Sequence, residues 1–106
     1  MKITSEELSQ KIESGETFVV DLYADWCGPC RMMSPVIESA AEKLKDEGSE
    51  VSIYKFNIEE DKEMASKLGV RSIPTIIAFS EGEKKITKVG LLNETQIINM
   101  ANEVLL

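Results

Sequence analysis

The run Phe18–Tyr23 constrains the fold more than any other stretch of this chain. It is short and almost continuously apolar. That pattern is typical of a strand that is buried on both faces, as in a parallel sheet covered by helices. The sequence therefore favours an α/β arrangement with this strand inside it.

Asp21, in the middle of this run, is the exception. A carboxylate in such a strand loses hydration, so we expect its pKa to be raised unless it is paired. It is either a buried Asp with satisfied hydrogen bonds, an Asp at the strand end facing water, or a functional group. Lys55, which interrupts a second strand-like run at 51–58, is a candidate partner. The alternative is that Lys55 extends its charged end to the surface.

Strand-like and helix-like patterns alternate along the rest of the chain. Helices are predicted at 4–14, from 31 to about 45, at 61–68 and from 93 onward, with strands at 18–23, 51–58, 75–79 and 84–89. Lys2-Ile3 is at most the stub of a further strand. The order (β)αβαβαββα, with this short first strand, predicts a central mixed β-sheet flanked by helices on both faces. Without a linker or internal repeat, residues 1–106 are expected to form a single domain.

Local signals mark two helix starts. Thr4 and Glu7 have the spacing of a capping box, and Asn93 and Gln96 repeat that spacing before the last helix. The apolar face of the last helix is predicted to consist of Ile97, Ala101, Val104 and Leu105.

The charge balance argues against one class of partner. With 19 acidic and 12 basic residues the net charge is −7. Phosphate binding needs a basic surface, so we expect no nucleic-acid partner. The first residues do not resemble a signal peptide, and no segment approaches the roughly 20 apolar residues that cross a bilayer. We therefore expect a soluble cytoplasmic protein, in a compartment that keeps thiols reduced.

Both cysteines lie in Trp26-Cys27-Gly28-Pro29-Cys30, between the first strand and the following helix. A mononuclear zinc site needs four ligands, and the chain has no His and no third Cys with which to complete one. A purely structural disulfide is a weak alternative, because closing so short a loop contributes only about 2 kcal/mol on the chain-entropy model. Two unrelated buried thiols are a further alternative, which the flanking Trp, Gly and Pro oppose.

A redox pair explains the spacing. On the first turn of a helix, residues three apart lie on one side at about 5–6 Å, which suits a disulfide. Cys27 at the helix start would face unpaired N–H groups and the positive end of the helix dipole, and both lower a thiol pKa. Cys30, one turn in, is more enclosed. Pro29 fits the first turn because its missing N–H has no helical partner there.

The segment Ala24–Met32 resembles the active site of the thioredoxin family. Further matches run in order over nearly the whole chain: Val20-Asp21, Pro35, Lys55–Ile58, Gly69–Thr75, Phe79 with Gly82, and Lys88–Gly90. A CxxC alone is a weak signal, whereas Trp-Cys-Gly-Pro-Cys followed downstream by Ile-Pro-Thr is a strong one. The chain departs from the family in its short first strand and in Tyr23, where many bacterial members carry Trp.

The resemblance implies a thioredoxin fold and a protein-disulfide reductase that works by thiol–disulfide exchange. Cys27 would be the attacking nucleophile and Cys30 the resolving thiol. Asp21, buried behind Cys30, would relay its proton, and Lys55 would tune Asp21.

The resemblance also implies a substrate surface around Cys27. Pro74 would be cis and packed against the disulfide. The Ile73 backbone would pair with an extended substrate segment in the manner of an added strand. The apolar contact surface would be formed by Trp26, Gly28, Pro29, Val70, Ile73, Pro74 and Gly90.

Partners follow by the same analogy. A thioredoxin reductase would recycle the oxidised protein, which would act on disulfide-containing proteins as a monomer, with no bound cofactor, no metal and no membrane. The nearest alternative is a disulfide isomerase or oxidase on the same fold. Such members typically carry His between the cysteines, where this chain has Gly28-Pro29, the dipeptide that sets a reducing potential. A thioredoxin-like interaction subunit with an idle dithiol is the other alternative, and the intact cysteines oppose it.

Overall fold

The computed structural model describes residues 1–106. Its elements follow one another in the order α1 (Ser5–Glu13), β1 (Phe18–Tyr23), α2 (Gly28–Asp46), β2 (Ser52–Asn57), the 3₁₀ turn η1 (Ile58–Glu60), α3 (Lys62–Lys67), β3 (Thr75–Ser80), β4 (Glu83–Val89) and α4 (Glu94–Val104). The expected first strand is reduced to an isolated parallel bridge between Lys2 and Lys55. The predicted α/β order is confirmed.

The four strands form one mixed sheet in the order β2-β1-β3-β4. β1 runs parallel to β2 and antiparallel to β3, and β4 pairs antiparallel with β3 at one edge. Glu81 and Gly82, with φ of 57° and 79°, make the tight turn that joins β3 to β4. The register of β1 on β2 sets Asp21 directly opposite Lys55.

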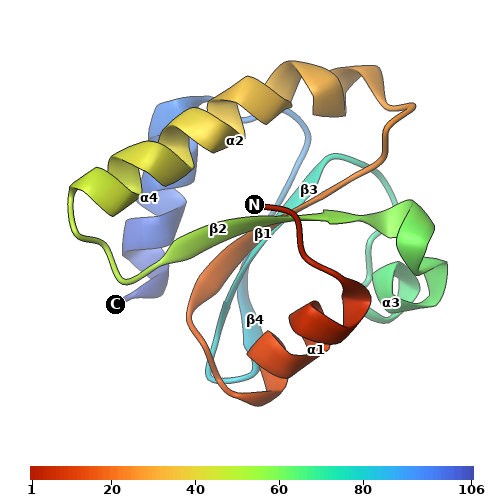
Figure 1. The fold of residues 1–106 in the computed structure, drawn as a ribbon, viewed down its shortest axis with the longest axis horizontal. Helices are drawn as coiled ribbons and strands as arrows, with labels where there is room; N and C mark the ends of the chain where they lie inside the picture. Colours follow the sequence, from red (N-terminus) through yellow and green to blue (C-terminus); the bar gives the residue numbers. More distant parts are fainter.

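Helices cover both faces of the sheet. Figure 1 shows α2 and α4 over one face and α1 and α3 on the other. The core is correspondingly divided. One cluster joins the sheet to α2 and α4 through residues such as Met33, Ile37 and Ile97. The other joins it to α1 and α3 through Leu8 and, at its margin, Met64.

The alternation of side chains along β1 decides which of its residues face α2. Val19 belongs to the cluster under α2 and α4, whereas Phe18, Val20 and Leu22 belong to the other cluster. Because successive strand residues point to opposite faces, Asp21 lies on the α2 face with Val19. The strand is buried along its whole length, as predicted.

Two details differ from the expectation based on apolar periodicity. The apolar periodicity starts at Arg31, but α2 begins at Gly28, with Cys27 as its N-cap and Pro29 in the first turn, as the spacing of the two cysteines predicted. Leu105 is not part of the apolar face of α4: the helix ends at Val104, and Leu105 is 47% exposed. Met100 is buried on that face instead. None of the helices has the combination of length and apolar character that crossing a membrane requires.

Candidate active site

Cys27 and Cys30 are joined by a disulfide at the start of α2, with their Cα atoms 5.2 Å apart. Cys27 is the N-cap residue of this 19-residue helix, and the backbone N–H of Cys30 donates to its Sγ at 3.2 Å. The first turn of α2 contains no acidic residue. A thiolate on Cys27 would therefore meet a hydrogen-bond donor and the positive helix end, both of which stabilise it.

The loop before β3 lies beside the disulfide. The peptide bond between Ile73 and Pro74 is cis. The Ile73 carbonyl oxygen lies 3.9 Å from Cys27 Sγ, and its side chain packs against the cluster that contains both cysteines. Gly90 N–H donates to the Pro74 carbonyl at 2.9 Å, so the end of β4 is fastened to the same loop. Ile73, Pro74 and Gly90 are thus brought together with the dithiol.

Val70 lies elsewhere. It packs against the cluster on the α1 and α3 face and not against the cluster that holds the cysteines. Its N–H donates to the Ala65 carbonyl at 3.0 Å, which closes the end of α3. The structure therefore gives Val70 a packing role at the end of α3.

Sequence reasoning missed three exposed apolar side chains near the disulfide: Met32, Val89 and Leu91, which are 70%, 63% and 54% exposed. Val89 pairs with Thr75, the residue after Pro74. The backbone N–H of Leu92 contacts the sulfur of Met33 at 3.3 Å, so the segment after β4 lies against the start of α2. The apolar residues that flank Gly90, after an otherwise charged edge strand, are the signal that would have indicated Val89 and Leu91.

Trp26, the single tryptophan, is 66% exposed beside Cys27. Its indole N–H donates to Glu59 Oε1 at 2.5 Å, and Lys62 Nζ lies 3.3 Å from the other oxygen of Glu59. The indole hydrogen bond and the Lys62 ammonium lower the pKa of Glu59. Glu59 thus orients the indole, a contact that sequence reasoning did not find because it joins the loop after β1 to η1.

Asp21 is only 1% exposed, and neither of its carboxylate oxygens has a hydrogen-bond partner in the protein. Burial raises its pKa from 3.8 to about 6, and the positive charge of Lys55 partly offsets that rise. A solvent-facing Asp at the strand end is therefore wrong, and no protein group donates a hydrogen bond to the buried carboxylate. What remains is a buried carboxyl that titrates near neutral pH on the face covered by α2.

Lys55 does not form the ion pair with Asp21 that the sequence allowed, although the two residues are directly opposite in the sheet. Its Nζ donates to Ser34 Oγ at 2.5 Å and lies 4.9 Å from the centre of the Tyr23 ring. Nor does it reach freely into solvent, since the side chain is half-buried. The influence of Lys55 on Asp21 is therefore an electrostatic one, without direct contact.

No group of three or more His, Cys, Asp or Glu side chains is arranged to hold a metal ion. The arrangement at the start of α2 supports dithiol chemistry. It combines a cysteine pair at disulfide distance, a stabilised position for a thiolate and a buried carboxyl on the sheet face that α2 covers.

Comparison with known proteins agrees with this chemistry. The family model described as Thioredoxin matches residues 1–103. A thioredoxin of Rickettsia bellii is 42% identical over 101 residues, covering 94% of this chain and 93% of that protein. A mutant thioredoxin from Halobacterium salinarum superimposes with a TM-score of 0.81 at 30% identity, covering 98% of this chain and 88% of the other. Chloroplastic thioredoxin z superimposes with a TM-score of 0.82 at 28% identity, covering 97% and 91%.

Proposed function

Since this chain belongs to the thioredoxin family, we propose that its protein-disulfide reductase activity runs through Cys27 as nucleophile and Cys30 as resolving thiol. The activity itself is thiol–disulfide exchange, and the redox-active pair is present as the Cys27–Cys30 disulfide. One observation carries the assignment of roles. Cys27 caps α2 and accepts the Cys30 N–H, so its thiolate is the stabilised one.

In the first step the Cys27 thiolate attacks one sulfur of a substrate disulfide. The substrate S–S bond breaks, a mixed disulfide forms on Cys27, and the second substrate sulfur leaves as a thiolate that takes up a proton. In the second step Cys30 gives its proton to the Asp21 carboxylate and attacks Cys27 Sγ. The mixed disulfide breaks and the first substrate sulfur leaves. Two electrons have passed from the dithiol to the substrate, and the Cys27–Cys30 disulfide remains.

Asp21 suits the role of proton acceptor for two reasons. It lies on the sheet face that α2 covers, and its pKa of about 6 is close to the operating pH, where a general base is most effective. Burial raises that pKa, and the charge of Lys55 offsets part of the rise. Gly28 and Pro29 keep the pair in the reducing range because no ionisable side chain stands between the cysteines.

The substrate is an extended segment that carries its disulfide to Cys27. It would pair with the backbone of Ile73, next to the cis bond before Pro74, in the manner of an added strand. Trp26, Gly90 and the exposed side chains of Met32 and Val89 supply the apolar contacts around it. Val70 would act only indirectly, through the end of α3.

The wider setting is proposed by family analogy. A thioredoxin reductase returns the disulfide to the dithiol, and disulfide-containing proteins are the substrates. The chain works as a single domain over residues 1–106, as a monomer in the cytoplasm, without a bound cofactor. Its net charge of −7 makes nucleic acid an unsuitable partner.

The Cys30→Ser variant tests the assignment. Attack by Cys27 on a protein disulfide such as that of insulin should proceed, but release should stop, so the covalent mixed disulfide accumulates and is visible by mass spectrometry. Cys27→Ser is the control and should form no adduct. Turnover of the Cys30→Ser variant at the wild-type rate, or an adduct on Cys30 in the control, would overturn the assignment.

A further inference from the structure

Lys55 is held away from the group that it should neutralise. In a parallel sheet, residues at the same register point to the same face, so Lys55 and Asp21 both lie under α2. Asp21 is buried without a hydrogen-bond partner, which is the situation in which a nearby ammonium gains most by contact. The contact is nevertheless not made.

The reason lies on α2. Ser34 is one helical turn beyond Cys30, on the same side of the helix, and its hydroxyl accepts the Lys55 Nζ hydrogen bond at 2.5 Å. The Tyr23 ring adds a second attraction at 4.9 Å. Both draw the ammonium into a cavity of about 130 Å³ that Cys30 also lines.

We propose that Ser34 is a positioning residue for the exchange reaction, whose hydroxyl holds the Lys55 ammonium in the cavity beside Cys30 and out of contact with Asp21. This inference rests on the proposed role of Asp21. With the ammonium held at a distance, the Asp21 carboxylate keeps its affinity for a proton and can accept the one that Cys30 must lose. Direct contact with an ammonium would stabilise the charged carboxylate and make Asp21 a weaker base.

Few other charged groups face Asp21 or line the cavity beside Cys30. Asp21 is flanked in the sheet by Lys55 on β2 and by the apolar Ile76 on β3. α2 presents Cys30 and Ser34 to the cavity, and Tyr23, whose hydroxyl pKa is raised by burial, lies on the same strand as Asp21. The remaining ionisable groups at the cavity are Lys2, Asp25 and Arg31.

The test is a titration of the Asp21 carboxyl carbon by ¹³C NMR in the reduced protein. In Ser34→Ala the freed ammonium can approach Asp21, so the midpoint should fall by about one pH unit, the lower end of the shift that a close opposite charge causes. Ser34→Thr keeps a hydroxyl and should titrate like the wild type. Ser39→Ala, on the same helix but bonded to Glu94, is the matched control and should leave the midpoint unchanged.

Lys55→Gln separates the effect of the charge from that of the hydroxyl. Its Asp21 midpoint should rise above the wild type, since the favourable charge is gone, and adding Ser34→Ala should then change nothing. An unshifted midpoint in Ser34→Ala would overturn the proposal. A shift of equal size in the Lys55→Gln background would also do so, because Ser34 would then act without Lys55.

The kinetic consequence is measured separately. The pH profile of mixed-disulfide release should move to lower pH in Ser34→Ala, with a smaller maximum rate, while the rate of attack by Cys27 is unchanged. An unmoved release profile alongside a shifted carboxyl midpoint would contradict the proposed relay by Asp21 but not the contact between Ser34 and Lys55. The two ideas therefore fail independently.

Discussion

Asp21 is the residue whose ionisation costs the fold most, because no protein group replaces the water that its carboxylate loses on burial. Its pKa is about 6 in the folded chain against 3.8 in an ordinary setting. Between these two values the folded protein binds more protons than the unfolded one. Stability is therefore highest below the unfolded pKa and falls as the pH rises through the folded pKa.

Replacing Asp21 by Asn removes this titration. We expect Asp21→Asn to raise the free energy of unfolding at about pH 8 by roughly 1–3 kcal/mol, since two pKa units correspond to about 3 kcal/mol and the amide also lacks partners. The gain should disappear by about pH 3.5, where the wild-type carboxyl is neutral in both states. Urea unfolding at both pH values measures it. Asp46→Asn, at the exposed end of α2, is the matched control for the change from Asp to Asn.

The same variant also separates the two chemical steps. Asp21→Asn should leave the attack of Cys27 on a disulfide nearly unchanged and slow the release of the mixed disulfide, by about 10²-fold or more if Asp21 is the general base. Rapid-quench trapping of the adduct distinguishes the steps. Equal slowing of both steps would mean that the introduced amide disturbs the site as a whole and that the relay role is wrong.

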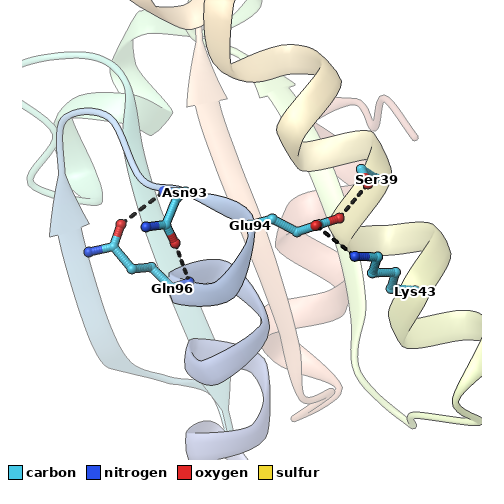
Figure 2. Close-up of polar contacts among 5 residues, drawn as sticks. All are labelled: Ser39, Lys43, Asn93, Glu94 and Gln96. Carbon is cyan, nitrogen blue, oxygen red and sulfur yellow. Dashed lines mark hydrogen bonds and ion pairs between the residues drawn. The ribbon is translucent and has the colours of Figure 1, made fainter.

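The two capping boxes were predictable because a cap depends on residues only three positions apart. Both occur as expected, at Thr4 with Glu7 and at Asn93 with Gln96. In Figure 2 the Asn93 side chain accepts the Gln96 N–H while Gln96 Oε1 accepts the Asn93 N–H, each at 2.8 Å. Contacts between elements were not predictable in this way.

Glu94 illustrates that limit. It follows the Asn93 cap in sequence, but its partners Ser39 and Lys43 come from α2, so only the packed structure reveals that it ties α4 to α2 (Figure 2). The side-chain direction of Lys55 escaped prediction for the same reason. The register of two strands does not decide which neighbour a long flexible side chain chooses.

The cap of α4 gives a prediction on stability. Asn93→Ala leaves the backbone N–H of Gln96 at the helix start without its partner, so we expect a loss of about 1 kcal/mol. Asn99→Ala is the matched control: it lies on the exposed side of the same helix, and alanine should be neutral or slightly stabilising there. The midpoints of urea unfolding of the two variants, compared with the wild type, measure the two changes in stability. Equal losses would mean that the cap contributes nothing specific.

At the scale of the whole molecule, the strand and helix order was predictable from the sequence pattern, and the residue-by-residue register of the strands was not. The period of apolar residues identifies Phe18–Tyr23 as a central strand, which it is. The position of Gly90 against Pro74 depends on the β3–β4 pairing, including an irregularity between Ala78 and Phe79. Such long-range register came only from the family resemblance, which also implied the cis bond before Pro74.

The packed fold holds the Cα atoms of Cys27 and Cys30 5.2 Å apart, within the range that a disulfide requires. Folding should therefore favour the disulfide, and loop closure alone should make the oxidised protein the more stable form by about 2 kcal/mol. By the thermodynamic cycle that links the two forms, this corresponds to a potential about 40 mV more negative in the folded chain than in the unfolded one. Stabilisation of the Cys27 thiolate acts in the opposite direction, because it favours the reduced form. The thiolate is stabilised by the Cys30 N–H and by the positive end of α2.

Two measurements on the wild-type protein test this balance together. Urea unfolding of the oxidised and reduced forms gives the difference in stability, and equilibration with a defined thiol buffer gives the reduction potential. We expect the potential near about −270 mV, the value for a reducing member, and far from the roughly −120 mV of an oxidant whose reduced form is the stable one. If the reduced form unfolds at a higher urea concentration than the oxidised form, then thiolate stabilisation dominates. The chain would in that case be an oxidant.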